Sequence, residues 1–308
     1  MAGSRYEYVR DFELGDAALP HTYLVVRIDG RGFHRFSHAH GFAKPNDAPA
    51  LELMNEAARA VLREFKGHIT LAFGESDEYS FLIDRASTLY SRRQSKLVSH
   101  IVSIFTGAYV FHWASYMRVP LQAPPSFDGR LVMYPGTQEV RDYFAWRQAD
   151  THINNLYNTT FWALVLQGGQ TEREAHNTLK GTYSKDKHEI LFSRFGINYD
   201  KLPALFRKGT TLVYAPVVTP GRPAGAKPKT ELRTLHVDII QDAFWRAAPD
   251  AAPGDAAVGA ADHADGSPSA DAPTSDDGAA GAHNPPFYAD PRRLQCAGLG
   301  ALVLSDRT

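Results

Sequence analysis

Apolar residues in the first half of the chain alternate between the spacing of strands and the spacing of helices. Residues 23–28 are apolar and β-branched and stop at Asp29-Gly30, so they predict a buried strand that ends in a turn. The same patterns predict five further elements, in chain order: a helix from about Ala48 capped by Asp47, strands at 69–73 and 79–83, a long helix through Leu97, Ile101, Phe105 and Tyr109, and a strand at 131–134.

The order strand, helix, strand, strand, helix, strand is that of a ferredoxin-like βαββαβ fold, so we expect an α+β protein. In this order the first strand lies beside a hairpin with a five-residue loop at 74–78, which brings Asp29 near Ser76, Asp77 and Glu78. After Pro135 the pattern is mainly helical, with helices expected at 140–149, 153–167 and 171–179 and strands at 210–218 and 230–238.

Composition divides the rest of the chain. Residues 247–286 hold 14 Ala, 7 Asp, 6 Pro and 5 Gly but no Lys or Arg, so they predict a disordered acidic insert. Outside the insert there are 33 basic and 27 acidic residues, a positive balance that permits a polyanionic partner. We expect a catalytic domain at 1–136, a mainly helical region with added strands at 137–246, the insert, and a tail at 287–308 whose apolar end docks on the core. The polar residues 1–18 are expected to fold over the core.

Several classes of protein are excluded. A single cysteine, Cys296, leaves no disulfide framework and no Cys-rich zinc site. No apolar run reaches the roughly 18 residues that cross a bilayer, and the N-terminus lacks the apolar stretch of a secretory signal. We therefore expect an intracellular protein without membrane association.

Three carboxylates carry the most specific chemistry. Asp29 ends an apolar strand, and Asp77 and Glu78 lie in the predicted hairpin turn. Convergent carboxylates suit Mg²⁺, and two ions roughly 3.5–4 Å apart can serve an attacking hydroxyl and a leaving pyrophosphate. From spacing alone, an Asp-Gly turn and a solvated hairpin tip remain alternative interpretations.

Glycines and cations near these carboxylates point to phosphate. Gly30 and Gly32 flank Arg31, which lets backbone N–H groups approach an anion closely. Lys44, Arg93 and Lys96, together with Arg92, are candidate triphosphate ligands, and a solvated basic face would explain them equally well. The aromatic residues Phe36, Tyr116, Trp146 and Trp162 are expected in the core.

Seven blocks of sequence are spread over roughly residues 4–246. They are Arg-Ile-Asp-Gly-Arg-Gly-Phe-His at 27–34, Phe-Ala-Lys-Pro-Asn-Asp at 42–47, Gly-Glu-Ser-Asp-Glu-Tyr-Ser-Phe at 74–81, Arg-Arg at 92–93 through Lys96, Phe-Asp-Gly-Arg at 127–130, Trp-Arg-Gln-Ala-Asp at 146–150 and His-Ile-Asn-Asn-Leu-Tyr-Asn at 152–158. In this order they resemble the tRNA-histidine guanylyltransferase family of the eukaryotic type.

The resemblance implies a palm-like catalytic domain that adds a guanylate to the 5′ end of tRNA-His in the 3′→5′ direction. ATP would adenylylate the 5′-phosphate, the 3′-hydroxyl of GTP would attack that end, and pyrophosphate would then be removed. It also implies a homotetramer located in the cytoplasm and/or nucleus. A broader templated polymerase that repairs tRNA 5′ ends and a non-catalytic RNA-binding module are the alternatives.

Carried over residue by residue, the resemblance assigns the site. Asp29, Asp77 and the Gly30 carbonyl would hold two Mg²⁺ ions, with Glu78 as electrostatic support. Nucleotide phosphates would be surrounded by Asp29, Gly30, Arg31, Gly32, Phe33, His34, Ser76 and Asp77 and neutralised by Lys44, Arg93 and Lys96. The tRNA-dependent steps would use His152, Asn154, Asn155 and Lys187, although side-chain bonds within the helical region are an alternative for this last group.

Overall fold

The computed structural model describes residues 4–217, 229–246 and 299–304. The predicted insert at 247–286 and most of the predicted tail lie outside these residues. The described part is a mixed α/β structure built on one six-stranded sheet in the order β4-β1-β3-β2-β5-β6. Its strands are β1 (Tyr23–Gly30), β2 (Ile69–Glu75), β3 (Glu78–Ile83), β4 (Phe127–Tyr134), β5 (Thr210–Pro216) and β6 (Thr230–Leu235).

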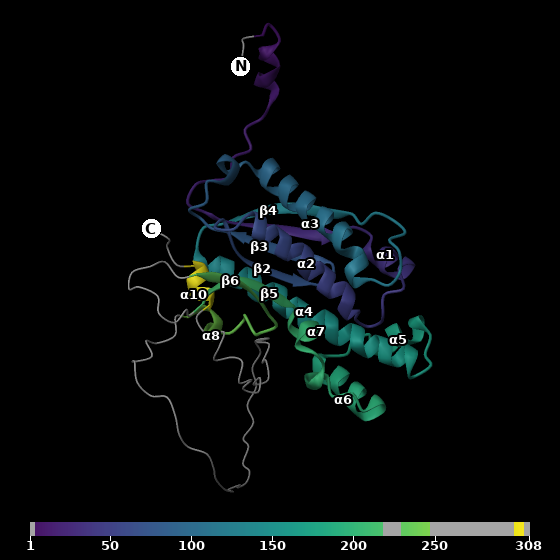
Figure 1. The fold of residues 1–308 in the computed structure, drawn as a ribbon. Helices are drawn as coiled ribbons and strands as arrows, with labels where there is room; N and C mark the ends of the chain where they lie inside the picture. The colour runs from purple at the N-terminus through teal and green to yellow at the C-terminus, as the bar shows by residue number, and fades with distance from the viewer. Residues whose placement is uncertain (1–3, 218–228, 247–298, 305–308) are drawn as a thin grey trace.

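The first four strands and two helices follow the element order expected from the sequence. Each neighbouring pair of these strands is antiparallel. The helices α2 (Ala48–Glu64) and α3 (Gln94–Tyr116) lie together on one face of the sheet (Figure 1). Alternate β1 residues, Leu24, Val26 and Ile28, point to that face and are fully buried in its core. Because side chains alternate along a strand, Arg27 and Asp29 belong to the opposite face.

The opposite face is covered by α4 (Thr137–Leu166), whose Val140 and Phe144 pack against Val25, Leu71 and Val213. The prediction of two helices at 140–149 and 153–167 is therefore wrong. No Gly or Pro interrupts residues 149–153, so the backbone continues as one helix of 30 residues. Strands β5 and β6 extend the same sheet beyond β2, and the predicted residue 218 lies outside the described part.

Small helices gather along α4 (Figure 1). Beside the middle and the C-terminal end of α4 lie α5 (Glu172–Leu179), α6 (Ser184–Phe195) and α7 (Ala204–Lys208), of which α6 and α7 were not predicted. At the other end lie α8 (Asp242–Trp245) and α10 (Leu299–Leu304). Leu299 and Val303 are buried in the same apolar cluster as Phe244 and Trp245, so the predicted docking of the apolar tail is confirmed for these residues.

The N-terminal segment does not fold over the core, contrary to the sequence prediction. It contains the 3₁₀ helix η1 (Glu7–Phe12), which buries no residue and extends away from the sheet (Figure 1). Its aromatic side chains are exposed, Phe12 by 78%. The segment contacts the body of the protein from Asp16 onward, where Ala18 is buried.

Helix α3 has two apolar faces. Within the described residues it is long and apolar enough to cross a membrane by length and composition, a test that core helices also pass. One face, with Leu97, Ile101 and Phe105, is buried in the core. The other face leaves Phe111 81% exposed, next to the partly exposed Val110.

Candidate active site

The carboxylates predicted from the sequence meet at one rim of the sheet. Asp29, near the end of β1, is the strand partner of Glu78, the first residue of β3. Strands β2 and β3 continue to Glu75 and Glu78, so the turn between them holds only Ser76 and Asp77, shorter than the predicted five-residue loop. The Gly30 N–H donates to the Asp77 carbonyl oxygen at 3.0 Å, which ties this turn to the end of β1.

Gly30 permits this close approach. A Cβ atom at this position would lie 2.7 Å from Asp77 Oδ2 and 2.4 Å from Cδ2 of the buried Phe33 ring. Any larger residue would therefore displace either the carboxylate or the ring. Gly30 was predicted to let the backbone approach a phosphate. In the structure, its missing side chain leaves the space that the Asp77 carboxylate needs.

Two arginines hold the acidic rim. The Arg27 guanidinium donates to Asp29 Oδ2 at 2.8 Å and to Glu78 Oε2 at 2.5 Å. Arg147, almost fully buried on α4, donates to the same Glu78 oxygen at 3.1 Å. Sequence analysis assigned neither arginine a role. The two-residue spacing of Arg27 and Asp29 on one strand was a usable signal, whereas nothing local in the sequence links Arg147 to Glu78.

Burial dominates the electrostatics of the rim. It raises the pKa of Asp77, and the neighbouring Asp29 charge adds to the effect. Burial likewise raises the pKa of Glu78 against the opposing influence of Arg147 and Arg27. The pKa of Glu75, also buried, is raised to about 8, although a hydrogen bond with Thr151 acts in the other direction. Several carboxylates therefore share a region of low dielectric, where a bound cation would stabilise their charged forms.

The donor set fits Mg²⁺ in its usual mode of binding. Among the described residues, no group of three or more His, Cys, Asp or Glu side chains is arranged to hold a metal. Mg²⁺ is commonly held by one or two carboxylates, with waters and substrate phosphates completing its shell. Asp29 and Asp77 both line the cavity, so this region offers the one or two carboxylates that such binding uses.

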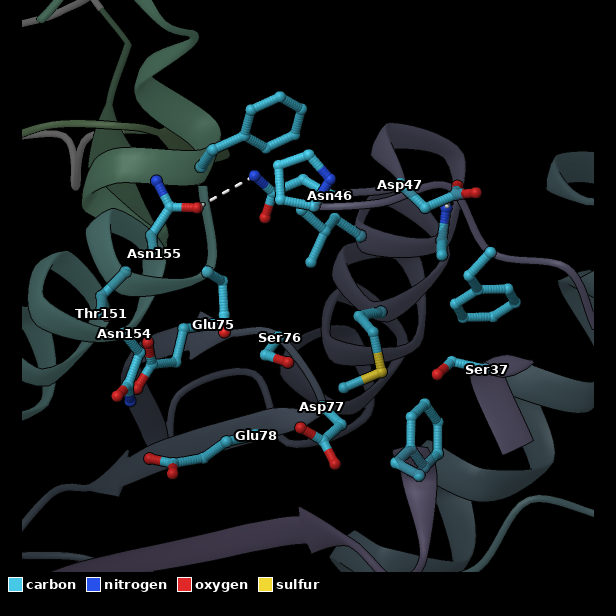
Figure 2. Close-up of a pocket in the computed structure, with 18 of the residues that line it drawn as sticks. Ser37, Asn46, Asp47, Glu75, Ser76, Asp77, Glu78, Thr151, Asn154 and Asn155 are labelled. Carbon is cyan, nitrogen blue, oxygen red and sulfur yellow. Dashed lines mark hydrogen bonds between the residues drawn. The ribbon is translucent and has the colours of Figure 1, made fainter. Parts of the chain in front are cut away.

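A cavity of about 790 Å³ opens beside the rim. Figure 2 shows Ser76, Asp77 and Glu78 on its floor, with α4 on one side and the start of α2 on the other. The predicted site residues that line it are Asp29, Phe33, His34, Lys44, Ser76, Asp77, Glu78, Asn154 and Asn155. Two of the lining residues are joined there: Asn46 Nδ2 donates to Asn155 Oδ1 at 2.9 Å.

Sequence comparison agrees with this arrangement. The profile described as "tRNAHis guanylyltransferase" matches residues 6–135, and the "Thg1 C terminal domain" profile matches residues 138–241. The chain is 52% identical to the tRNA(His) guanylyltransferase of Schizosaccharomyces pombe, over 81% of this chain and 97% of the relative. It is 48% identical to a probable tRNA(His) guanylyltransferase of Homo sapiens, over 81% and 88%. This chain belongs to the eukaryotic tRNA(His) guanylyltransferase family.

Solved structures of the family have the same fold. The crystal structure of the Saccharomyces cerevisiae tRNA(His) guanylyltransferase superposes with a TM-score of 0.66 at 49% identity, covering 68% of this chain and 93% of that one. A bacterial tRNA(His) guanylyltransferase-like protein in complex with ATP superposes with a TM-score of 0.58 at 22% identity. The match covers 76% of this chain and 91% of the bacterial chain, and it shows a likeness of fold alone. The family and the nucleotidyltransferase class predicted from the sequence are thus confirmed.

Other residues expected from the family resemblance do not line the cavity. Arg31 is exposed, and Gly32, at φ 66°, precedes the short helix α1 (Phe33–Ala39). Arg93 Nε donates to Asp16 Oδ1 at 2.9 Å, and Lys96 is exposed one turn further along α3. The role of these four residues as nucleotide ligands in guanylyltransferases stays a prediction for this chain.

The basic start of α3 has an acidic partner within the chain. Asp16 accepts hydrogen bonds from the Ser95 N–H and from Arg93, and its bonds to Ser95 and Arg93 lower its pKa to about 2. Arg92 is buried and donates to the carbonyl oxygens of Leu19 and Thr22. It anchors the segment before β1, so its candidate role as a triphosphate ligand is wrong for this conformation.

The residues expected in tRNA-dependent steps separate into two groups. Asn154 and Asn155 face the cavity. His152 instead lies against Tyr199 and His188, with ring centroids 5.5 Å and 6.5 Å away. Lys187, on α6, donates to the Thr182 carbonyl at 2.8 Å. These contacts leave the predicted tRNA roles of the family untested in this chain.

The core assignment of the aromatic residues was partly wrong. Phe36 is buried, as predicted. Trp146 is 56% exposed, with the Arg147 guanidinium carbon 3.5 Å from its ring centroid. Trp162 is half-buried and lines the cavity. The helical spacing showed that Trp146 and Trp162 belong to a helix. It did not show that the two indole side chains lie outside the core.

Proposed function

We propose that this chain adds a guanylate to the 5′ end of tRNA-His by 3′→5′ nucleotidyl transfer. The observation that carries the proposal is the convergence of Asp29 and Asp77 at the floor of the cavity, in a chain about half identical to tRNA(His) guanylyltransferases. Nucleotidyl transfer depends mainly on positioning and on neutralising phosphate charge, and this cavity offers groups for both.

The reaction has three balanced steps. The 5′-monophosphate of the tRNA attacks the α-phosphorus of ATP, and pyrophosphate leaves. The 3′-hydroxyl of GTP then attacks the adenylylated 5′-phosphate, so that a new phosphodiester forms, AMP leaves and the hydroxyl proton is released. Hydrolysis finally removes pyrophosphate from the added triphosphate and leaves a 5′-monophosphate.

Side chains of this chain would have separate tasks in these steps. Asp29 and Asp77, with the Gly30 carbonyl, would hold Mg²⁺, which supplies charge neutralisation and hydroxyl activation when bound. Arg27 and Arg147 fix Glu78 beside them through the ion pairs described above. Lys44 and His34 line the cavity and would neutralise triphosphate oxygens.

We also propose that the β4-β1-β3-β2 part of the sheet is a polymerase-like palm. Its support is the antiparallel βαββαβ order with an acidic turn between β2 and β3 and an aspartate at the end of the central β1. In this arrangement the end of β1 and the β2–β3 turn would supply metal ligands at one rim, as a two-metal site requires.

A homotetramer completes the proposal. The adjacent exposed apolar residues Val110 and Phe111 of α3 support it, because assembly would remove their side chains from water. Placement in the cytoplasm and/or nucleus, where precursor tRNAs are processed, follows from the proposed substrate.

The test is Mg²⁺-dependent incorporation of labelled GTP into 5′-monophosphorylated tRNA-His, with and without ATP. Asp29→Ala and Asp77→Ala should each abolish incorporation while circular dichroism stays that of the wild type. Other tRNA species serve as substrate controls, because equal labelling of all of them would favour a broader repair polymerase. Unchanged turnover in either variant would refute the metal role.

A further inference from the structure

The cavity extends well beyond the carboxylates, along α4. Asp150 and Trp162 both line it and are twelve positions apart on this helix, roughly 18 Å along the axis. That span is about five steps of stacked bases at 3.4 Å each. The cavity therefore has a carboxylate end and a second end, formed by α4 and α5, away from Asp29, Asp77 and Glu78.

The second end carries an indole that core packing does not explain. Trp162 belongs to none of the apolar clusters among the described residues. Its neighbours Tyr157 and Phe161 pack against the cluster of Leu164, Ala175 and Leu179, and Phe161 meets Trp162 edge-on with centroids 5.3 Å apart. The Lys44 ammonium lies 5.6 Å from the Trp162 ring centroid, near the outer limit of a cation–π contact.

Two polar residues of α4 and α5 line the same cavity as this indole. Asn158 is exposed one turn before Trp162 on α4. His176, on α5, shares a 2.9 Å hydrogen bond between Nδ1 and the Tyr157 hydroxyl, and its side chain also lines the cavity. An aromatic face with a neighbouring cation and amide and imidazole groups is the combination that binds unpaired bases, by stacking and by hydrogen bonds to their edges.

We infer that the α4–α5 end of the cavity binds an unpaired nucleobase, with Trp162 as its stacking surface and Asn158 and His176 at its edge. The inference rests on the proposed function, which supplies two sources of such a base: an end of the tRNA, or a nucleoside triphosphate. Both present the same chemistry to the indole, a flat ring next to phosphate that Lys44 can reach.

A binding experiment tests this without requiring turnover. ATP, GTP and tRNA-His are each titrated into the full chain while tryptophan fluorescence is followed, in the wild type and in Trp162→Phe, which keeps a stacking ring but removes the indole signal. A stacked base should quench the wild type and leave Trp162→Phe largely unquenched with similar affinity. Trp162→Leu should weaken the same ligand about tenfold, because each stacked base contributes on that scale.

Phe192→Ala is the matched control, because Phe192 is 64% exposed on α6 and does not line the cavity. It should bind all three ligands as the wild type does. Quenching by tRNA alone assigns the base to the tRNA, and quenching by one nucleotide assigns it to that nucleotide. Equal quenching in the wild type and Trp162→Phe for all three ligands, or unchanged affinity in Trp162→Leu, would overturn the inference. If the wild type adds no guanylate to tRNA-His, the proposed function is refuted, but the binding result remains valid.

Discussion

Asn46 and Asn155, 109 positions apart in the chain, both line the cavity and are joined side chain to side chain at 2.9 Å. The same Asn155 donates through Nδ2 to the Tyr199 hydroxyl at 3.0 Å. One buried amide thus links the loop before α2, which lines the cavity, to Tyr199, against which His152 packs. These contacts run from the cavity wall through α4 to a residue expected to serve the tRNA.

Replacing Asn155 by Leu should destabilise the protein. The substitution leaves the Tyr199 hydroxyl and the Asn46 amide without this partner, and an unsatisfied buried polar group costs about 1–3 kcal/mol. Urea unfolding followed by circular dichroism measures the change. The control is Asn154→Leu, exposed on the same helix, which should stay within about 0.5 kcal/mol of the wild type. Equal losses in the two variants would show that the bridge does not contribute to stability.

A methyl group at Gly30 should impair both folding and catalysis. In Gly30→Ala the new Cβ displaces the Phe33 ring or the Asp77 carboxylate, and overpacking of this kind costs about 1–3 kcal/mol. Guanylate addition should fall at least tenfold because Asp77 moves. The matched control is Gly15→Ala, whose Cβ would meet nothing within 4 Å. Wild-type activity in Gly30→Ala would contradict the close packing of the rim.

His152 should make stability depend on pH. Burial, with the neighbouring His188 charge, lowers its pKa in the folded state, while Asp200 acts in the opposite direction. Below about pH 6.5 the unfolded chain therefore binds more protons than the folded one. The contribution of neutral His152 to the free energy of unfolding is complete above that pH. It is lost as the pH falls through the lowered pKa of the folded state.

The measurement is the melting temperature of the wild type and of His152→Gln between about pH 7.5 and about pH 5. The variant should lose less stability on acidification, because it has no imidazole to protonate. Parallel curves for the two proteins would mean that His152 does not titrate differently on unfolding.

A charge on the outer face of α3 should separate the proposed subunits. Phe111→Glu places a carboxylate in an apolar patch that assembly would bury, which is costly without a partner charge. Sedimentation velocity should show the wild type as a tetramer and the variant as smaller species with unchanged circular dichroism. A comparable charge at the exposed Phe192, Phe192→Glu, should leave the assembly intact. A tetramer of Phe111→Glu would place the interface elsewhere.

The periodicity of the sequence was sufficient for the elements that build the sheet. Strand β1 and helices α2 and α3 follow directly from apolar spacing, and their order placed Asp29 beside the turn at Asp77. The lengths were less predictable. Strands β2 and β3 run into Glu75 and Glu78, charged residues that a propensity argument assigns to a loop.

Contacts between distant segments were outside the reach of a single sequence. The basic start of α3 suggested a bound anion, and the structure supplies Asp16, about eighty positions earlier, as the partner of Arg93. Arg147 reaches Glu78 only because α4 crosses that face of the sheet. Local patterns carry no record of such crossings, so these partners required the three-dimensional structure.

The uninterrupted length of α4 restricts how this chain can vary. Arg147, Asn155 and Trp162 all project from one helix and meet three separate neighbours, Glu78, Asn46 and Lys44. Inserting or deleting one residue between Arg147 and Trp162 would turn every later side chain by about 100° around the axis. Insertions and deletions should therefore be tolerated in the turn after Leu166 and be eliminated by selection within the helix.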